Sequence, residues 1–165
     1  MSKTTTVRFQ DRHFWALDDA FAVWFAYLVE SIEGHEALDD ELREAVEHWR
    51  VATFVTDVGV DVPELSARGF EQLLSGADRA QRRATEAGDV SCEALASWQL
   101  IPDQPVSGAF SRTGTSVERE RILEVATGFA QLIRGLLPTD PEGGWWLLGT
   151  GEGPVVLPGR RQGPA

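Results

Sequence analysis

Apolar residues repeat at three- and four-residue steps along four separate segments of the chain, and this repeat limits the possible folds more than any other feature. The clearest repeat covers residues 18–33. Its apolar positions fall on one face of a helix: Phe21, Trp24, Phe25, Leu28 and Ile32. A helix with so wide an apolar face must bury it against other elements, so we expect this helix at the centre of the core.

The same repeat predicts three further helices, over residues 39–58, 66–87 and 116–137. Asp39 or Asp40 suits the N-terminal cap of the first of these, because a side-chain oxygen there accepts hydrogen bonds from free N–H groups of the first turn. The end of that helix is rich in β-branched residues, which weakens the prediction of its last turns.

The helix predicted over residues 66–87 contains two glycines. Gly69 and Gly76 each cost about 1 kcal/mol relative to alanine in a helix interior. They weaken the prediction of a helix, although the apolar repeat continues past both of them.

Shorter segments show the alternation that is typical of strands. Apolar and polar residues alternate over residues 96–100, and residues 106–110 are a second strand candidate. Residues 145–157 predict an antiparallel hairpin, because two apolar runs flank a turn rich in glycine. The expected fold class is therefore α+β and mainly α, with about four helices in a compact, bundle-like core and a small antiparallel β-sheet that includes the C-terminal hairpin.

A chain of 165 residues is long enough to bury its own core, so we expect a single domain over residues 1–165 with frayed tails at about 1–8 and 158–165. The one cysteine, Cys92, cannot form an internal disulfide, and the N-terminus lacks the apolar segment of a secretion signal. The longest apolar run, residues 20–29, is too short to span a bilayer. These features predict a cytoplasmic protein with no membrane partner, and the strong preference for arginine over lysine is typical of a GC-rich bacterial genome.

Negative charge is concentrated in the first third of the chain, where residues 11–47 hold nine of the eleven net negative charges. Asp40, Glu44 and Glu47 stand at i, i+4 and i+7 of the second predicted helix, so they form one stripe on the face opposite its core residues. A stripe of this kind attracts a basic protein surface and repels nucleic acid.

This charge distribution predicts a small acidic interaction protein, such as an inhibitor, immunity or regulatory partner, and a non-enzymatic role is favoured. The candidate partner-binding residues are the acids of the second helix and one exposed tryptophan of the hairpin: Asp39, Asp40, Glu41, Glu44, Glu47 and Trp146. The stripe also has a simpler interpretation, as a solvated face that keeps a small protein soluble. A third interpretation is a homodimer, in which the acidic face of one copy meets the arginines of the helix over 66–87 in another.

The loop before the last predicted helix supports an alternative function. Free backbone N–H groups and the helix dipole can hold an anion there, with Ser111, Arg112, Thr115 and Ser116 as the candidate residues. An aromatic pocket would complete a small-molecule-binding protein or enzyme. The same loop also fits a capping box formed by Thr115 and Glu118, which needs no ligand.

No motif in the sequence predicts a cofactor, a metal site or a catalytic nucleophile. Glu44 and His48 lie four residues apart, but no second histidine follows at ligand spacing. The glycine-rich residues 149–153 are followed by a proline and a strand, not by the helix that a dinucleotide-binding fingerprint requires, so they predict a turn. Cys92 lies beside an acid and matches no nucleophile motif.

Overall fold

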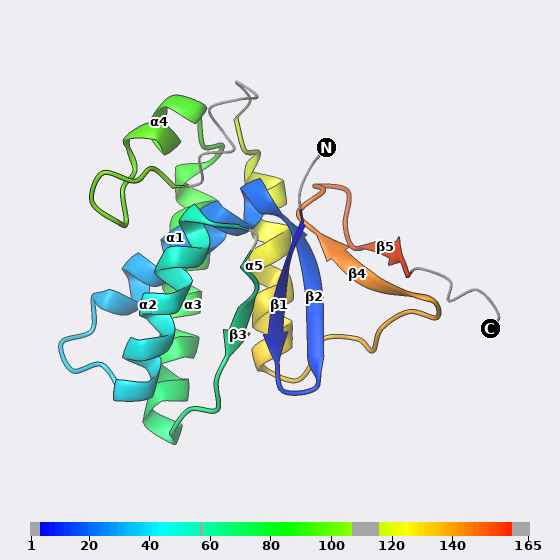
Figure 1. The fold of residues 1–165 in the computed structure, drawn as a ribbon, viewed down its shortest axis with the longest axis horizontal. Coiled ribbons are helices and arrows are strands. Elements are labelled where there is room, and N and C mark those ends of the chain that lie inside the picture. The colour runs from blue at the N-terminus through cyan, green and yellow to red at the C-terminus, as the bar shows by residue number, and fades with distance from the viewer. Residues whose placement is uncertain (1–3, 57, 107–115, 160–165) are drawn as a thin grey trace.

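The computed structural model describes residues 4–56, 58–106 and 116–159, and within these ranges the chain forms five helices and one five-stranded mixed sheet (Figure 1). The elements follow in this order: β1 (Thr4–Phe9), β2 (Arg12–Leu17), α1 (Asp18–Glu33), α2 (Asp40–Phe54), β3 (Val60–Val62), α3 (Ala67–Ala87), α4 (Cys92–Ser97), α5 (Arg119–Ile133), β4 (Gly144–Leu148) and β5 (Val155–Pro158). The protein is mostly helical, as the sequence predicted.

The sheet has the strand order β3-β1-β2-β4-β5. Strands β1 and β2 form an antiparallel hairpin at its centre, and β3 and β4 add to the two sides of this hairpin in parallel. Strands β4 and β5 are antiparallel and form the predicted C-terminal hairpin. The expectation of a purely antiparallel sheet is wrong, because helices carry the chain back between paired strands and make parallel pairing possible.

Residues 4–8, expected to belong to a frayed tail, form most of β1. Three threonines and Val7 make this segment rich in β-branched residues, which favour strands. Val7 pairs with Phe14 on one side and with Val60 on the other, and it is fully buried. The N-terminal segment is therefore part of the core of the sheet.

The helix predictions were best where the apolar repeat is strongest. The helix over residues 18–33 is confirmed at both ends as α1. Helix α2 ends at Phe54, four residues before its predicted end, where the β-branched residues begin to dominate. Helix α5 is shorter than predicted at both ends.

The strand predicted over residues 96–100 is wrong. The short helix α4 ends inside this segment at Ser97, and residues 98–100 belong to no helix or strand. The Ser91 hydroxyl caps α4 by accepting a hydrogen bond from the N–H of Ala94. A cap with local hydrogen bonds outweighed an alternation of only five residues. Of the second candidate strand, Val106 is described and is buried outside any strand, and the other residues lie outside the described ranges.

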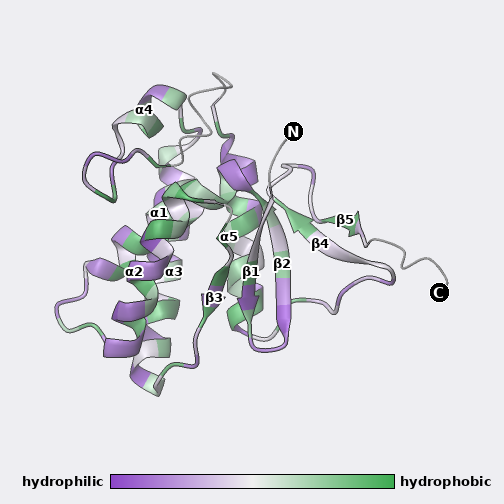
Figure 2. Ribbon diagram, in the orientation of Figure 1, coloured by the Kyte–Doolittle hydropathy of each residue, from purple (hydrophilic) through white to green (hydrophobic). Residues whose placement is uncertain are grey.

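Helices cover one face of the sheet, and α5 lies directly behind β1 and β2 in Figure 1. Helix α1 is buried on nearly all sides, because it packs on α2, α3 and α5 as well as on the hairpin. At its centre the ring of Phe25 lies 5.9 Å from that of Trp49 and 5.7 Å from that of Phe129. Helix α2 lies at the outside of this assembly, and its mixture of hydrophobic and hydrophilic turns is visible in Figure 2.

Candidate functional site

Helix α2 carries or adjoins five of the six residues expected to bind a partner, and its N-terminal cap and its buried face fix its orientation. The Asp39 carboxylate accepts hydrogen bonds from the N–H groups of Glu41, at 3.2 Å, and Leu42, at 3.3 Å, so the predicted cap is confirmed. Trp49, on the opposite side of the helix from the acids, is buried and its indole N–H donates to the backbone oxygen of Asp61 at 3.1 Å. The acidic face is thereby held toward solvent.

The Asp39 carboxylate makes its hydrogen bonds with other residues of the protein. The Ser66 hydroxyl donates to its carboxylate at 2.7 Å, which lowers the pKa of Asp39 below its usual value, and the N–H groups of Leu42 and Glu41 lower this pKa further. Glu41 lies close by and accepts from the N–H of Ser66 at 3.3 Å. Both carboxylates therefore join the start of α2 to the start of α3.

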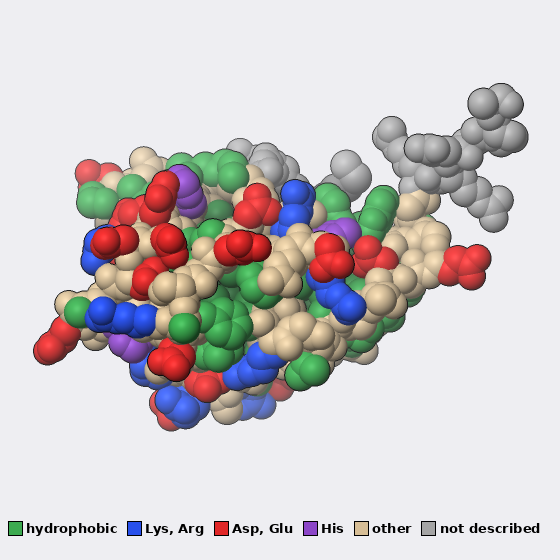
Figure 3. Space-filling model, turned by 90° about the horizontal axis from the view of Figure 1, so that it is seen from below, with side chains coloured by type: hydrophobic (Ala, Val, Ile, Leu, Met, Phe, Trp, Pro, Cys, Tyr) green, Lys and Arg blue, Asp and Glu red, His purple; other side chains and the backbone are tan. Residues whose placement is uncertain are grey.

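Asp40, Glu44 and Glu47 are the acids that form a row on the solvent face of α2. The side chains of Asp40 and Glu47 are 91% and 63% exposed, and each has an arginine of the same helix beside it, Arg43 and Arg50 respectively. Glu44 is exposed, and its side chain makes no hydrogen bond or ion pair with any described residue. Figure 3 shows acidic side chains gathered at the upper left, the side on which α2 lies.

The arginines of α3 mostly contact the neighbouring α1 and the α1–α2 loop. Arg68 donates to the backbone oxygen of Ala37 at 2.7 Å, Arg79 donates to that of Ser31 at 2.6 Å, and Arg83 pairs with the carboxylate of Glu30. These contacts hold α3 against α1. They leave few guanidinium groups of α3 free to meet the acidic face of a second copy.

Three valines continue the row of acids toward the C-terminal end of α2 and beyond it. Val51, Val55 and Val58 are 46%, 38% and 50% exposed. The sequence analysis treated them only as the uncertain end of a helix. The signal that could have found them is their spacing of four and three residues, in phase with the acids before them.

Trp146 does not share a surface with these acids. Strand β4 lies across the molecule from α2, with α1, α5 and the central hairpin between them (Figure 1). Trp146 is half-buried against the core, and its indole N–H donates to the backbone oxygen of Thr139 at 3.0 Å. The adjacent Trp145 lies on the opposite sheet face, with its ring 6.3 Å from that of Trp15.

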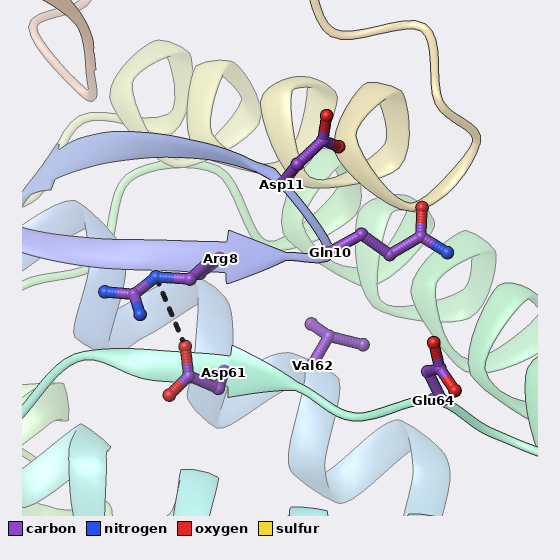
Figure 4. A pocket seen from close by; sticks show the side chains of 6 residues that line it. All are labelled: Arg8, Gln10, Asp11, Asp61, Val62 and Glu64. Carbon is purple, nitrogen blue, oxygen red and sulfur yellow. Dashed lines mark ion pairs between the residues drawn. The ribbon is translucent and has the colours of Figure 1, made fainter.

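Two adjoining hollows lie near the turn between β1 and β2. One is lined by Arg8, Gln10, Asp11, Asp61, Val62 and Glu64, and the other includes the stacked rings of Phe9 and Phe70, 6.4 Å apart. The Arg8 and Asp61 side chains turn toward each other in Figure 4, whereas those of Gln10, Asp11 and Glu64 do not converge. Nε of Arg8 lies 3.6 Å from Oδ1 of Asp61. The first hollow therefore lacks the convergent polar groups that orient a small ligand.

Three of the four residues of the expected anion site lie outside the described ranges: Ser111, Arg112 and Thr115. Ser116 is described and is exposed. Helix α5 begins at Arg119 with Glu118 as its N-cap residue, so the capping box expected of Thr115 and Glu118 is wrong. The hollow with Phe9 and Phe70 adjoins residues 133–135, at the far end of α5, about 22 Å from its start.

The glycine-rich residues 149–153 form the turn that the sequence predicted, and this turn encloses the carboxylate of Glu124 from α5. The N–H groups of Gly149, Gly151 and Gly153 donate to that carboxylate at 3.0, 2.9 and 3.3 Å. Successive backbone N–H groups in such a turn form an anion-binding concavity. Here a side chain of the protein itself occupies that concavity and fixes the β4–β5 turn on α5.

Within the described ranges, no three histidine, cysteine, aspartate or glutamate side chains gather where they could hold a metal ion. Glu44 and His48 are both exposed on α2. None of the helices in the described part of the chain is long and apolar enough to cross a membrane.

Comparisons with models of known protein families, with curated proteins and with solved structures give no match to this chain. The functional argument therefore depends on the chemistry of the surface. Among the described residues, α2 and the segment after it carry three of the six large exposed apolar side chains, next to the exposed acids of this helix.

Proposed function

We propose that this protein is a small, non-enzymatic interaction protein that binds a basic protein surface through the solvent face of α2, as an inhibitor, an immunity protein or a regulatory partner does. The observation that carries the proposal is the exposed row of Asp40, Glu44 and Glu47. The Glu44 side chain in this row makes no hydrogen bond or ion pair with any described residue. Like charges at this spacing destabilise a helix by about 0.2–0.5 kcal/mol per pair, and a basic partner would remove that cost. Opposite charge also speeds association and selects the partner.

A small-molecule function has less support. The hollow with Phe9 and Phe70 and the loop before α5 lie at opposite ends of that helix, so they do not form one pocket. The polar side chains at the adjoining hollow are exposed and do not converge. A ligand site needs an apolar cavity and a few aligned polar groups in the same place.

Affinity capture from a lysate of the source organism tests the proposal with three forms of the protein. The first is the natural chain, the second carries Asp40→Asn, Glu44→Gln and Glu47→Gln, and the third is a matched control. The control removes three exposed acids of α3 and α4 instead: Glu71→Gln, Glu86→Gln and Glu93→Gln. Circular dichroism checks that all three forms are folded.

We expect a basic protein to be retained by the natural chain and by the control at low salt, and to be lost at high salt because the interaction is screened. The α2 variant should retain about tenfold less of it. Equal retention by the two variants, or retention of no basic protein by any form, would contradict the proposal.

A further inference from the structure

Large exposed apolar side chains are few in the described part of the protein, and half of them lie in line with the acids of α2. The six such residues are Val51, Val55, Val58, Leu136, Val155 and Val156. The first three are 46%, 38% and 50% exposed. Exposed apolar side chains that are scattered singly are ordinary, whereas a group of them beside a charged row is typical of an interaction site.

The backbone holds these three valines close together at the C-terminal end of α2. The N–H of Val55 donates to the backbone oxygen of Val51 at 2.9 Å, and the N–H of Val58 donates to that of Val55 at 3.2 Å. The four-residue step from Val51 to Val55 follows the helix, in which it keeps side chains on one side. Val55 is the C-cap residue of α2, with non-helical φ and ψ angles of −111° and 85°, and Val58 lies in the segment after it. The acids at positions 40, 44 and 47 and Val51 share one face of α2, so this surface is acidic along the helix and apolar at its C-terminal end.

The fold gains little from valine at these positions. Valine has a lower helix propensity than alanine, leucine or glutamine, because its branched side chain loses rotamer freedom against the preceding turn. The contacts of α2 with α1 come from other residues, among them Leu42, Val46 and Trp49, which are buried. Val51, the one of the three that lies inside α2, thus weakens the helix, and none of the three belongs to the hydrophobic core.

We infer that the partner meets α2 with one amphipathic basic helix, whose lysine or arginine side chains lie over the acids and whose apolar side chains pack on Val51, Val55 and Val58. This inference rests on the proposed function and adds the form of the partner to it. A row one side chain wide matches the ridge of another helix, and the distance from Asp40 to Val55 is about 22 Å, or four helical turns. Recognition of an amphipathic helix uses anchors at this spacing.

A second copy of this chain fits the row poorly. In a parallel arrangement of two α2 helices, carboxylates would face carboxylates, and like charges at close range repel. In an antiparallel arrangement, carboxylates would be buried against valines without a partner, which is more costly still. Charge complementarity therefore favours a basic partner over self-association.

Two labelled synthetic peptides and one scrambled peptide serve as the probes. Each designed peptide is a helix of about five turns with lysines along one half of a face and leucines along the other half, and the two peptides place the lysines at opposite ends. The scrambled peptide has the same composition without an amphipathic face. Fluorescence anisotropy measures their affinity for the natural chain, for Val51→Thr/Val55→Thr/Val58→Thr, and for the matched control Val155→Thr/Val156→Thr at the exposed β5.

We expect the natural chain and the control to bind at least one designed peptide about tenfold more tightly than the valine variant does. Threonine keeps the shape of valine but removes apolar area, so this difference in affinity should be the same at low and at high salt. The scrambled peptide should bind the natural chain about as weakly as the designed peptide binds the valine variant. Val55→Thr alone should give a smaller loss in the same direction, which keeps the test meaningful if the triple variant unfolds.

Three outcomes would overturn the inference: equal affinity of the valine variant and the natural chain, no preference for the designed over the scrambled peptide, or a dimer in sedimentation that the valine variant abolishes. The acid variant of α2 separates this failure from that of the proposed function. If the acid variant loses the salt-dependent part of peptide binding while the valine variant binds normally, the result supports a basic partner and contradicts the apolar contact. If the acid variant also binds normally, both fail.

Discussion

Two tryptophans of the core have the same burial and different hydrogen bonding. Trp24 and Trp49 are 0% and 1% exposed. The indole N–H of Trp49 donates to the backbone oxygen of Asp61 on β3, whereas that of Trp24 has no acceptor among the described residues. A buried donor without an acceptor costs about 1–3 kcal/mol, so Trp24 contributes through its volume only.

Replacing each of these tryptophans by phenylalanine should separate volume from hydrogen bonding. Trp49→Phe loses volume and leaves the Asp61 oxygen without its donor, and we expect a loss of about 3 kcal/mol in the free energy of unfolding. Trp24→Phe loses similar volume but removes an unsatisfied donor, so its loss should be about 1–2 kcal/mol smaller. Urea denaturation measures both, and an equal or larger loss for Trp24→Phe would contradict the interpretation.

His35, in the loop between α1 and α2, has surroundings that favour its neutral form. Burial lowers the pKa of His35 below its usual value of 6.5, and the nearby positive charge of Arg79 lowers this pKa further. The Arg79 guanidinium lies 2.7 Å from Nε2 of His35, so this nitrogen accepts a hydrogen bond that protonation would destroy. The histidine thus connects the α1–α2 loop to α3 only while it is uncharged.

The stability of the protein should fall as the pH drops below about 6.5. In the unfolded chain His35 binds a proton near its usual pKa, and in the folded protein it does so only at lower pH, so acid favours the unfolded state across that interval. The His35→Gln variant keeps an acceptor and does not titrate, and its free energy of unfolding should change less between pH 7.5 and pH 5.5. Parallel pH profiles for the two proteins would show that His35 has no such role.

At the scale of elements, the close packing of α1 on α3 explains one of the glycines that weakened the helix prediction. A Cβ atom added at Gly76 would lie 2.5 Å from Cγ1 of Ile32, which is fully buried. A Cβ atom at Gly69 would lie 2.8 Å from the carboxylate of Asp39. Both glycines stand where α3 approaches its neighbours, so their helix propensity is less important than their size.

Gly76→Ala should therefore destabilise the protein although alanine is the better helix former. The gain in propensity is about 1 kcal/mol, and overpacking against Ile32 should cost about 1–3 kcal/mol more than that. Thr85→Ala, on the exposed face of the same helix, is the control and should change stability by less than about 0.5 kcal/mol. A higher melting temperature for Gly76→Ala would mean that α1 and α3 can separate at little cost.

The elements that the sequence predicted well depend on local patterns, and those it missed depend on distant partners. Helix α1 was found because one apolar repeat covers its whole length. Strand β1 was missed because its pairing with β3 and its burial depend on residues more than fifty positions away. The acids of α2 were placed correctly on one exposed row, but Trp146 was expected at the surface because a sequence does not reveal which face of a strand the helices will cover.

For the molecule as a whole, the formal net charge of −11 is unevenly distributed. Arginines of α2 and α3 pair with several acids of α1 and α2, while acids of the α2 row remain in solvent. Repulsion between exposed like charges opposes the compact state more than the expanded one. The exposed acids therefore lower the stability of the folded protein.

Added salt should stabilise the folded protein at neutral pH. Screening weakens repulsion among the exposed acids, while exposed ion pairs contribute little that could be lost. We expect the free energy of unfolding to rise by about 1 kcal/mol between low and physiological salt. Calorimetry at several sodium chloride concentrations measures this, and a steady decrease in melting temperature would show that the internal ion pairs outweigh the repulsion.

The position of the β1–β2 hairpin in the sheet has a consequence for synthesis of the protein on the ribosome. The hairpin emerges well before one of its flanking strands, β4, which ends only at Leu148. At ordinary rates of translation the outer edge of β2 stays unpaired for roughly ten seconds. An unpaired strand edge can pair with strands of other chains. A nascent chain of this protein should therefore be prone to pair with other chains until β4 has been made and covers this edge.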